Sequence, residues 1–399
     1  MHAHFQDECR GLVAMRRLYK DNNLILLLFV SFRLMMLATF LPEDLTMFGD
    51  YSYYYQLASL SDKGFIPFIH YWSEHLPVFP FLSIGIYKMA KLFGGGYGSY
   101  ARLLGLTMLI FDAGNLWLLM RLAKRIYGEE KSILLGWVYS LLFVPLIFAW
   151  WTFEPMTAFF ILLSLEFLFS GKEGFSAIMV GLGAMTKLIP MLVMPAVIRV
   201  CSSRLKYVTT VAITVGFIAG TLLLAGGEMA MASFLSPLAR SSYQTVWALM
   251  DGNLGTGLLG SVEKHFDLRY AFTPAGNPPR FPEWLKALVF GLLYLLLYRK
   301  VRFENAPRDV INLVTLTITV FLLWSKGWSP QWQVFLFPLI LLMMPGYKGV
   351  LYILVLSFVN LMEWPLALGH NLNHLLPMTV LLRTAIFLLL LVECMKIRA

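Results

Sequence analysis

The chain contains many apolar stretches that are long enough to cross the roughly 30 Å hydrocarbon core of a membrane. They begin near residues 23, 99, 132, 155, 206, 283, 308, 330, 348 and 374. Hydrophobic residues make up 58% of the 399 residues and charged residues only 14%, far from the composition of soluble domains. The sequence therefore predicts an all-α integral membrane protein, a polytopic bundle of transmembrane helices. No signal-peptide cleavage site follows the first stretch, so we expect it to be a retained span.

Basic residues predict how the chain is oriented in the membrane. Short cytoplasmic loops carry an excess of lysine and arginine, and the segment RLAKRIYGEEK at 121–131 is strongly basic. If residues 76–93 crossed the membrane, this segment would lie on the same side as Asp50. We therefore expect residues 77–93 to form an amphipathic helix on the extracytoplasmic surface. The net charge of +9 then reflects membrane orientation, and no nucleic-acid partner is expected.

The stretch from 175 to 200 is too long for one span, and it contains Lys187 just before Pro190. We predict two short antiparallel segments that turn near Lys187, which returns the basic residues that follow to the cytoplasm. The total is then about 12 spans in a single integral membrane domain, 1–399. Residues 41–98 are expected to form a first extracytoplasmic loop with surface helices, and residues 227–281 a second large loop.

With this topology, unusual polar residues gather at the extracytoplasmic ends of the spans. Acids and bases that cluster at one membrane face suggest an active site. The candidates are Asp50, Tyr54, Glu74, His75, Glu154, Lys187, Arg240, Lys326 and Gln331. Arg33, in the middle of the first span, is instead expected to neutralise an acid within the bundle or to extend toward the interface.

These residue types suit the transfer of a sugar from a lipid phosphate. The phosphate leaves as a stable anion, so the reaction needs a base and cations rather than a strong acid. Asp50 is the candidate catalytic base, and Lys187, Lys326 and Arg240 are candidates for binding the donor phosphate. In an alternative interpretation, Asp50 caps a helix that begins near Ser52.

The remaining candidates are expected to contact substrate, and they are Glu74, His75, Glu154, Gln331 and Tyr54. Glu74 and His75 suit binding of the acceptor. A metal site at these two residues is an alternative, but no second ligand follows at the i+4 spacing. We therefore expect neither a metal nor another cofactor.

Four short motifs resemble those of the GT-C glycosyltransferases. They are FGDYSYYY at 48–55, WWTFEP at 150–155, GLGAMTKLIP at 181–190 and KGWSPQW at 326–332. Within this superfamily the chain is most similar to mannosyltransferases that use polyprenyl-phosphate mannose. The resemblance implies an inverting transferase in the plasma membrane of a prokaryote, with a GT-C-like bundle and an extracytoplasmic active site. It also implies a polyprenyl-phosphate-linked sugar as donor and a lipid or glycan as acceptor.

Two other classes of protein remain open at this point. A transporter or flippase of lipid-linked sugars also has polar residues among many spans, but it is expected to have charges near the bilayer midplane and repeats in its two halves. The polar groups here favour one face. A non-catalytic subunit of a membrane glycosylation complex is the third interpretation, since such a subunit can retain a site without turnover.

Overall fold

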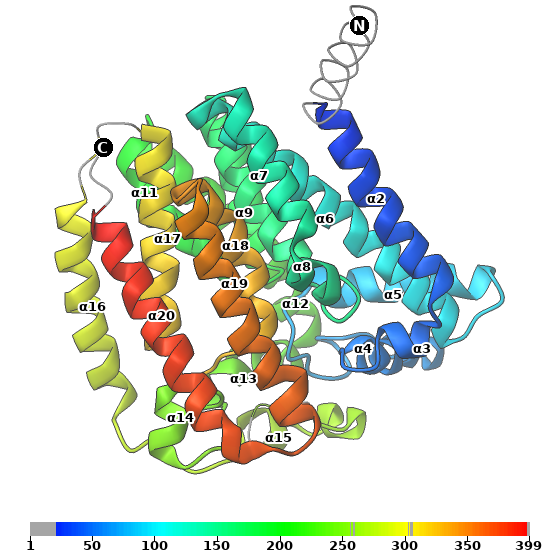
Figure 1. The fold of residues 1–399 in the computed structure, drawn as a ribbon. Coiled ribbons are helices and arrows are strands. Elements are labelled where there is room, and N and C mark those ends of the chain that lie inside the picture. The colour runs from blue at the N-terminus through cyan, green and yellow to red at the C-terminus, as the bar shows by residue number, and fades with distance from the viewer. Residues whose placement is uncertain (1–20, 256, 258–259, 302, 304–305, 397–399) are drawn as a thin grey trace, which may run out of the picture.

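We analysed a computed structural model of the chain, which describes residues 21–255, 257, 260–301, 303 and 306–396. Within these residues every regular element is a helix, and extended pairing is limited to two isolated bridges, Pro67 with Tyr71 and Tyr243 with Gly327. The all-α prediction is confirmed. Most helices run between two ends of the molecule, and α2 begins at the same end at which α20 finishes (Figure 1). We call this the termini end and the opposite one the site end.

The helices that run along the bundle are α2 (Asn22–Thr39), α6 (Tyr97–Tyr127), α7 (Glu129–Leu141), α9 (Glu154–Phe169), α10 (Glu173–Ala184), α11 (Met194–Val200), α12 (Arg204–Gly226), α16 (Glu283–Lys300), α17 (Ala306–Trp324), α18 (Gln333–Met343), α19 (Tyr347–Leu361) and α20 (Leu376–Lys396). Short helices gather at the site end, and they are α3 (Pro42–Leu45), α4 (Tyr51–Ser59), α13 (Glu228–Ala239), α14 (Val246–Asp251) and α15 (Leu268–Phe272) (Figure 1). The remaining elements are α5 (Val78–Leu92), α8 (Phe143–Phe148), η1 (Leu60–Lys63), η2 (Ile189–Val193), η3 (Val262–Phe266), η4 (Pro330–Trp332), η5 (Met362–Ala367) and η6 (Asn373–Leu375).

Among the described residues, six helices are long and apolar enough to cross a membrane. They are Asn22–Thr39, Tyr97–Tyr127, Arg204–Gly226, Pro307–Trp324, Tyr347–Ala367 and Asn373–Lys396. The protein is therefore an integral membrane protein. The expected number of about 12 spans is not reached by this criterion, because other apolar helices such as α10 and α18 are shorter than a bilayer-spanning helix.

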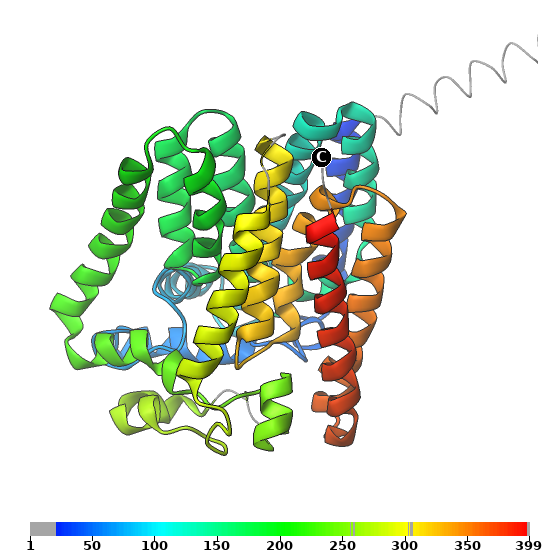
Figure 2. The same cartoon turned by 90° about the vertical axis from the view of Figure 1, so that its left-hand side faces the viewer.

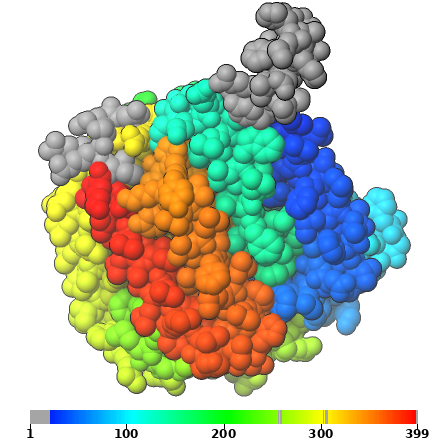
Figure 3. Space-filling view, viewed as in Figure 1, coloured from blue at the N-terminus to red at the C-terminus, as the bar shows by residue number. Residues whose placement is uncertain are grey.

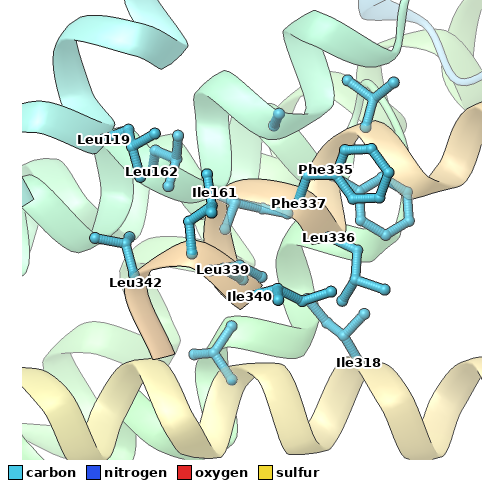
Figure 4. Close-up of a cluster of buried hydrophobic side chains, with 14 of the residues drawn as sticks. Leu119, Ile161, Leu162, Ile318, Phe335, Leu336, Phe337, Leu339, Ile340 and Leu342 are labelled. Atoms are coloured by element: carbon cyan, nitrogen blue, oxygen red, sulfur yellow. The ribbon is translucent and has the colours of Figure 1, made fainter. Parts of the chain in front are cut away.

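The core is centred on α18, in which every residue from Gln333 to Met343 is buried. This helix is apolar on all sides, so it must be surrounded by other helices. It packs against α6, α9, α17 and α19. Figure 4 shows Phe337 and Ile340 of α18 in the same cluster as Ile161 of α9 and Ile318 of α17.

The outward faces of the bundle are apolar as well. In α12 only Tyr207 and Val211 are buried, and the Leu224 side chain is 92% exposed. In Figure 3, α20, α19, α7 and α2 lie side by side on one face. Large exposed side chains of α19 and α20 include Leu354, Phe358 and Leu389. Apolar surface of this extent needs a partner, which a lipid bilayer supplies.

Arg33 lies inside the bundle and is 1% exposed. Its Nε donates to Asp112 Oδ2 at 3.0 Å, and the hydroxyl of Tyr139 donates to Asp112 Oδ1 at 2.8 Å. The guanidinium also lies 3.4 Å from the centre of the Phe29 ring. The prediction that Arg33 neutralises an acid within the bundle is therefore confirmed, and its side chain does not extend to the interface.

Two segments are difficult to interpret in the sequence. The segment 175–200 is broken, as predicted, and residues 78–92 form one continuous helix, α5. α10 ends at Ala184, and η2 begins at Ile189 and continues into α11, so the chain turns at Lys187 between two short segments. α5 runs across the direction of the long helices, as comparison of Figures 1 and 2 shows. Residues 78–92 are thus not one of the long apolar helices. Its place on the extracytoplasmic surface remains a prediction.

Candidate active site

Asp50 is held at the site end by close backbone packing. Its N–H donates to the carbonyl of Trp151 at 2.8 Å. The preceding Gly49 permits this approach, because a Cβ atom there would lie 2.4 Å from the Cα of Trp151. The indole of Trp364 adds a bond from Nε1 to the carbonyl of Phe48 at 2.9 Å. The glycine in FGD therefore fixes where the carboxylate of Asp50 lies.

The carboxylate of Asp50 is not used as a helix cap. Asp50 precedes α4, but its side chain makes no capping hydrogen bond to that helix. The capping alternative is therefore wrong. The carboxylate instead accepts a hydrogen bond from the hydroxyl of Tyr54, Oδ2 to OH, at 3.2 Å.

Burial raises the pKa of the Asp50 carboxyl from 3.8 to about 7. The hydrogen bond from Tyr54 opposes this shift, the negative charges of Glu74 and Glu154 add to it, and Lys187 opposes it. A carboxyl with a pKa near neutrality is a suitable general base, because it can both take up and release a proton at physiological pH.

Glu154 and Lys187 form an ion pair beside Asp50. Glu154 is the first residue of α9 and is 1% exposed, while Lys187 lies in the turn after α10. The Lys187 ammonium lies 4.8 Å from the centre of the Trp332 ring, and burial lowers its pKa although Glu154 and Asp50 oppose the shift. Glu154 Oε2 has no hydrogen-bond partner among the described residues. The ion pair therefore keeps the Lys187 ammonium next to Asp50. Glu154 Oε2 remains available to accept a hydrogen bond.

An ion pair between Glu74 and Arg240 joins the two long segments of the site end, 41–98 and 227–281. Arg240, which follows α13, pairs with Glu74 Oε2, and the hydroxyl of Tyr53 donates to Glu74 Oε1 at 2.6 Å. Burial raises the pKa of Glu74, but Arg240, His75 and Tyr53 together outweigh it, and the net pKa is below the usual value. Glu74 is therefore ionised, and it neutralises Arg240 in this arrangement.

His265 also belongs to this cluster, although no motif in the sequence singled it out. Its Nε2 lies 2.5 Å from the hydroxyl of Tyr53, and its Nδ1 lies 2.7 Å from the carbonyl of Trp72. Its ring contacts the Trp72 indole at a tilt of 32°, with 4.3 Å between the centres. His265 comes from η3, more than 200 residues after Tyr53, so only the tertiary structure brings the two together.

His75 contributes a neutral imidazole. Burial lowers its pKa to about 4, so the ring carries no charge at pH 7. The ring meets Tyr54 and Phe153 edge-on, with centres 5.4 and 5.2 Å apart, and its Nε2 has no hydrogen-bond partner in the described part of the chain. A small pocket is lined by Tyr54, Leu57, Ala58, Tyr71, Ser73, His75, Phe79, Pro80, Ser83 and Ile84. An imidazole of this kind suits a hydrogen bond to a hydroxyl rather than the binding of an anion.

Lys326 lies at the edge of the cluster. Its Nζ donates to the carbonyl of Leu238 in the last turn of α13 at 2.6 Å. Burial lowers its pKa, with Lys286 and Arg240 contributing in the same direction and Glu283 opposing. Lys286, which sequence reasoning did not single out, is 4% exposed and pairs with Glu283 at 2.7 Å. Lys326 is thus coupled to Arg240 more closely than to Asp50.

The structure brings nearly all the candidate residues into one electrostatic cluster. Each member of this cluster affects the pKa of at least one other member, and the members are Asp50, Tyr54, Glu74, His75, Glu154, Lys187 and Arg240. Gln331 is half-buried in η4, next to the Trp332 ring that Lys187 contacts. In the ranges that the structure describes, no three His, Cys, Asp or Glu side chains are arranged to hold a metal ion.

The arrangement can hold an anionic ligand beside a carboxylate base, with aromatic rings around both. Comparison with known protein families and with curated proteins finds no match to this chain.

Proposed function

We propose that this protein is an inverting glycosyltransferase. It moves a sugar, mannose by our inference, from a polyprenyl-phosphate donor to a lipid or glycan acceptor on the extracytoplasmic side of a prokaryotic plasma membrane. The observation that carries this proposal is the carboxylate of Asp50, whose pKa is raised to about 7 beside the buried cation Lys187. The motif resemblance to GT-C enzymes points to the same reaction.

The chemistry follows from the charges of these groups. The acceptor hydroxyl attacks the anomeric carbon, and Asp50 takes the proton of that hydroxyl. The bond between this carbon and the phosphate oxygen breaks on the opposite face, which inverts the configuration. The phosphate leaves with the bonding electron pair, and Lys187, Arg240 and Lys326 stabilise its charge.

The remaining groups of the cluster are assigned to the sugar and the acceptor. His75 offers Nε2 to a hydroxyl, and Tyr54 lies between this ring and Asp50. Glu154 has a free Oε2 that can accept a hydrogen bond from a second hydroxyl. Glu74 and Gln331 complete the substrate contacts in this proposal.

The proposed topology has about 12 spans, in which shorter helices accompany the six long ones. Support comes from α7 with α8, α9, α10, η2 with α11, α16 and α18, which lie between the longer helices in chain order. A short helix can lie within a bundle when longer neighbours shield it from lipid, and α18 is buried in this way. α5 lies on the extracytoplasmic surface in this topology.

A transporter or flippase of lipid-linked sugars is the second candidate. Two buried ion pairs favour it, Arg33 with Asp112 and Arg383 with Glu363, because charges inside a bundle often mark a transport path. Transport of a fluorescent lipid-linked sugar across sealed vesicles, with no change in its covalent structure, would support this alternative. A non-catalytic subunit would show neither transport nor transfer.

The test compares two carboxylate variants in lipid nanodiscs. Purified protein receives radiolabelled polyprenyl-phosphate mannose and a lipid extract as acceptor. Asp50→Asn should reduce transfer on the order of 100-fold or more, the usual size of a general-base effect, without loss of donor binding. Asp62→Asn is the matched control, because Asp62 forms surface ion pairs with Lys88 and Lys91 away from the cluster. An Asp50→Asn variant that transfers at the wild-type rate would overturn the proposal.

A further inference from the structure

A buried ion pair in the C-terminal helices reaches the loop that carries Arg240. Arg383 of α20 is 2% exposed and Glu363 of η5 is fully buried, and Arg383 Nη1 pairs with Glu363 Oε2. The other terminal nitrogen, Nη2, donates to the backbone carbonyl of Gln244, a loop residue between α13 and α14. The guanidinium also lies 4.8 Å from the centre of the Trp328 ring. The ion pair therefore contacts two segments of the site end, one that contains Gln244 and one that contains Trp328.

Gln244 itself has an unusual backbone conformation. Its φ is +51°, in the left-handed region that few residues other than glycine adopt. In the amide orientation that satisfies both side-chain atoms, Gln244 Nε2 donates to the carbonyl of Trp328 at 3.1 Å and to Glu363 Oε1 at 3.0 Å. Such a conformation persists only where surrounding groups enforce it, and it often marks a functional constraint. Arg383 and Glu363 supply the groups that enforce it here.

The neighbours of Gln244 are paired with the segment that carries Lys326. Tyr243 N–H donates to the carbonyl of Lys326 at 3.0 Å, and Trp328 N–H donates to the carbonyl of Tyr243 at 3.1 Å. Thr245 Oγ1 donates to the same Lys326 carbonyl at 3.1 Å. Gly327 allows the ring of Tyr243 to lie against it, because a Cβ there would be 2.2 Å from Tyr243 Cε1. These contacts join residues 243–245 to residues 326–328, and we call them the junction. The junction thus fixes both segments.

We propose that Arg383 and Glu363 are positioning residues, which hold Arg240 and Lys326 where the donor phosphate binds. This inference rests on the proposed function for its substrate, but the anchoring itself does not. A buried ion pair is weak evidence for stability, since an apolar replacement is often as stable, so a role in specifying geometry better explains its presence. The pair touches neither sugar nor phosphate and acts through the junction at Gln244.

Kinetics test the positioning role. Arg383→Lys keeps the charge but loses the two-pronged contact with Glu363 and Gln244, and it should lower kcat/KM for polyprenyl-phosphate mannose at least tenfold. In a Lys326→Met background the same substitution should have less effect, because one of the two groups that it positions is gone and only Arg240 remains. Asp112→Asn is the control, since it breaks a buried ion pair elsewhere, and its effect should multiply with that of Lys326→Met. If the effects of Arg383→Lys and Lys326→Met on kcat/KM multiply in full, the proposal is overturned.

Hydrogen exchange gives a readout that needs no activity. In Glu363→Gln, the amides of Tyr243 and Trp328 should exchange at least tenfold faster, whereas in Asp112→Asn they should not change. Gln244→Gly, which tolerates the positive φ but removes the side-chain bonds, replaces Glu363→Gln if that variant does not fold. Unchanged exchange in the folded variant would overturn the anchoring. Faster exchange together with a wild-type protein that transfers no sugar would instead remove the proposed function and leave the anchoring in place.

Discussion

Asp50 has the two properties of a general base that the sequence could not supply, a raised pKa and a position next to a cation. If Asp50 accepts the acceptor's proton, the ionised form is the active one. Because its pKa is about 7, kcat/KM for sugar transfer should fall about tenfold for each pH unit below that value and level off above it. His75 stays neutral over this range, since its pKa is about 4. Initial rates of transfer measured across the pH range check this prediction.

Folding stability should respond to the same carboxyl in a defined direction. Its pKa in the folded protein lies above the unfolded value, so the protonated form is favoured by folding. The stability that it contributes is fully present below the ordinary aspartate pKa of 3.8 and is lost as the pH rises through about 7. At pH 8 the neutral Asp50→Asn variant should therefore melt no lower than the wild type. A clearly lower Tm at that pH would contradict the assigned shift.

At the level of elements, the turn between α10 and η2 decides where Lys187 lies. Gly183 is needed for this turn, because a Cβ there would lie 2.8 Å from the Cβ atoms of Phe160 and Pro190. Gly181 plays the same part against Thr214 of α12, with 2.7 Å to its Cβ. The glycines of the GLGAMTKLIP motif thus serve close helix packing, which places the lysine that follows them.

Gly183→Ala should push η2 away from α10 and move Lys187 from its place beside Glu154. We expect transfer activity to fall at least tenfold, with a loss of about 1 to 3 kcal/mol in the free energy of unfolding from overpacking. Gly174→Ala is the matched control in the same helix, because a Cβ there meets nothing within 4 Å. Rates and melting temperatures of both variants are the measurement, and equal activity in the two would show that this turn does not position the lysine.

Element boundaries at the site end were the hardest to predict. The segment 227–281 was predicted as one large loop, and the structure places α13, α14, η3 and α15 within it. Several of these helices have only five or six residues. Helices this short are unstable alone and leave no periodic pattern, so they form only where tertiary contacts hold them.

For the whole molecule, we expect the site end to face the extracytoplasmic side of the membrane. Cysteine labelling tests this orientation, with two exposed lysines as matched positions in a background without the native cysteines. Lys91→Cys at the end of α5 should react with a membrane-impermeant maleimide in intact cells. Lys131→Cys, in the basic segment at the start of α7, should react only after permeabilisation. The opposite pattern would place the Asp50 cluster in the cytoplasm and rule out an extracytoplasmic transferase.

Some features of this protein follow from its sequence alone. Its membrane class does, because the transfer free energies of apolar residues add along a stretch whatever the fold around it. The break at Lys187 does as well, since the length of the largely apolar stretch 175–200 and a nearby proline are local properties. Asp50 could be singled out in the same way, as an acid within an aromatic segment beside a span.

The partners of these residues were decided by the tertiary structure. Arg33 and Asp112 lie 79 residues apart in the chain, and Tyr53 and His265 lie 212 apart. Arg383, Glu363 and Gln244 come from three separate segments, and no local pattern marks any of them as neighbours. Contacts of this kind depend on how whole helices pack, and the same packing removes water from Asp50 and so sets its pKa. Asp50 could therefore be singled out from the residues as a candidate base, whereas its pKa and the cations around it are properties of the folded bundle.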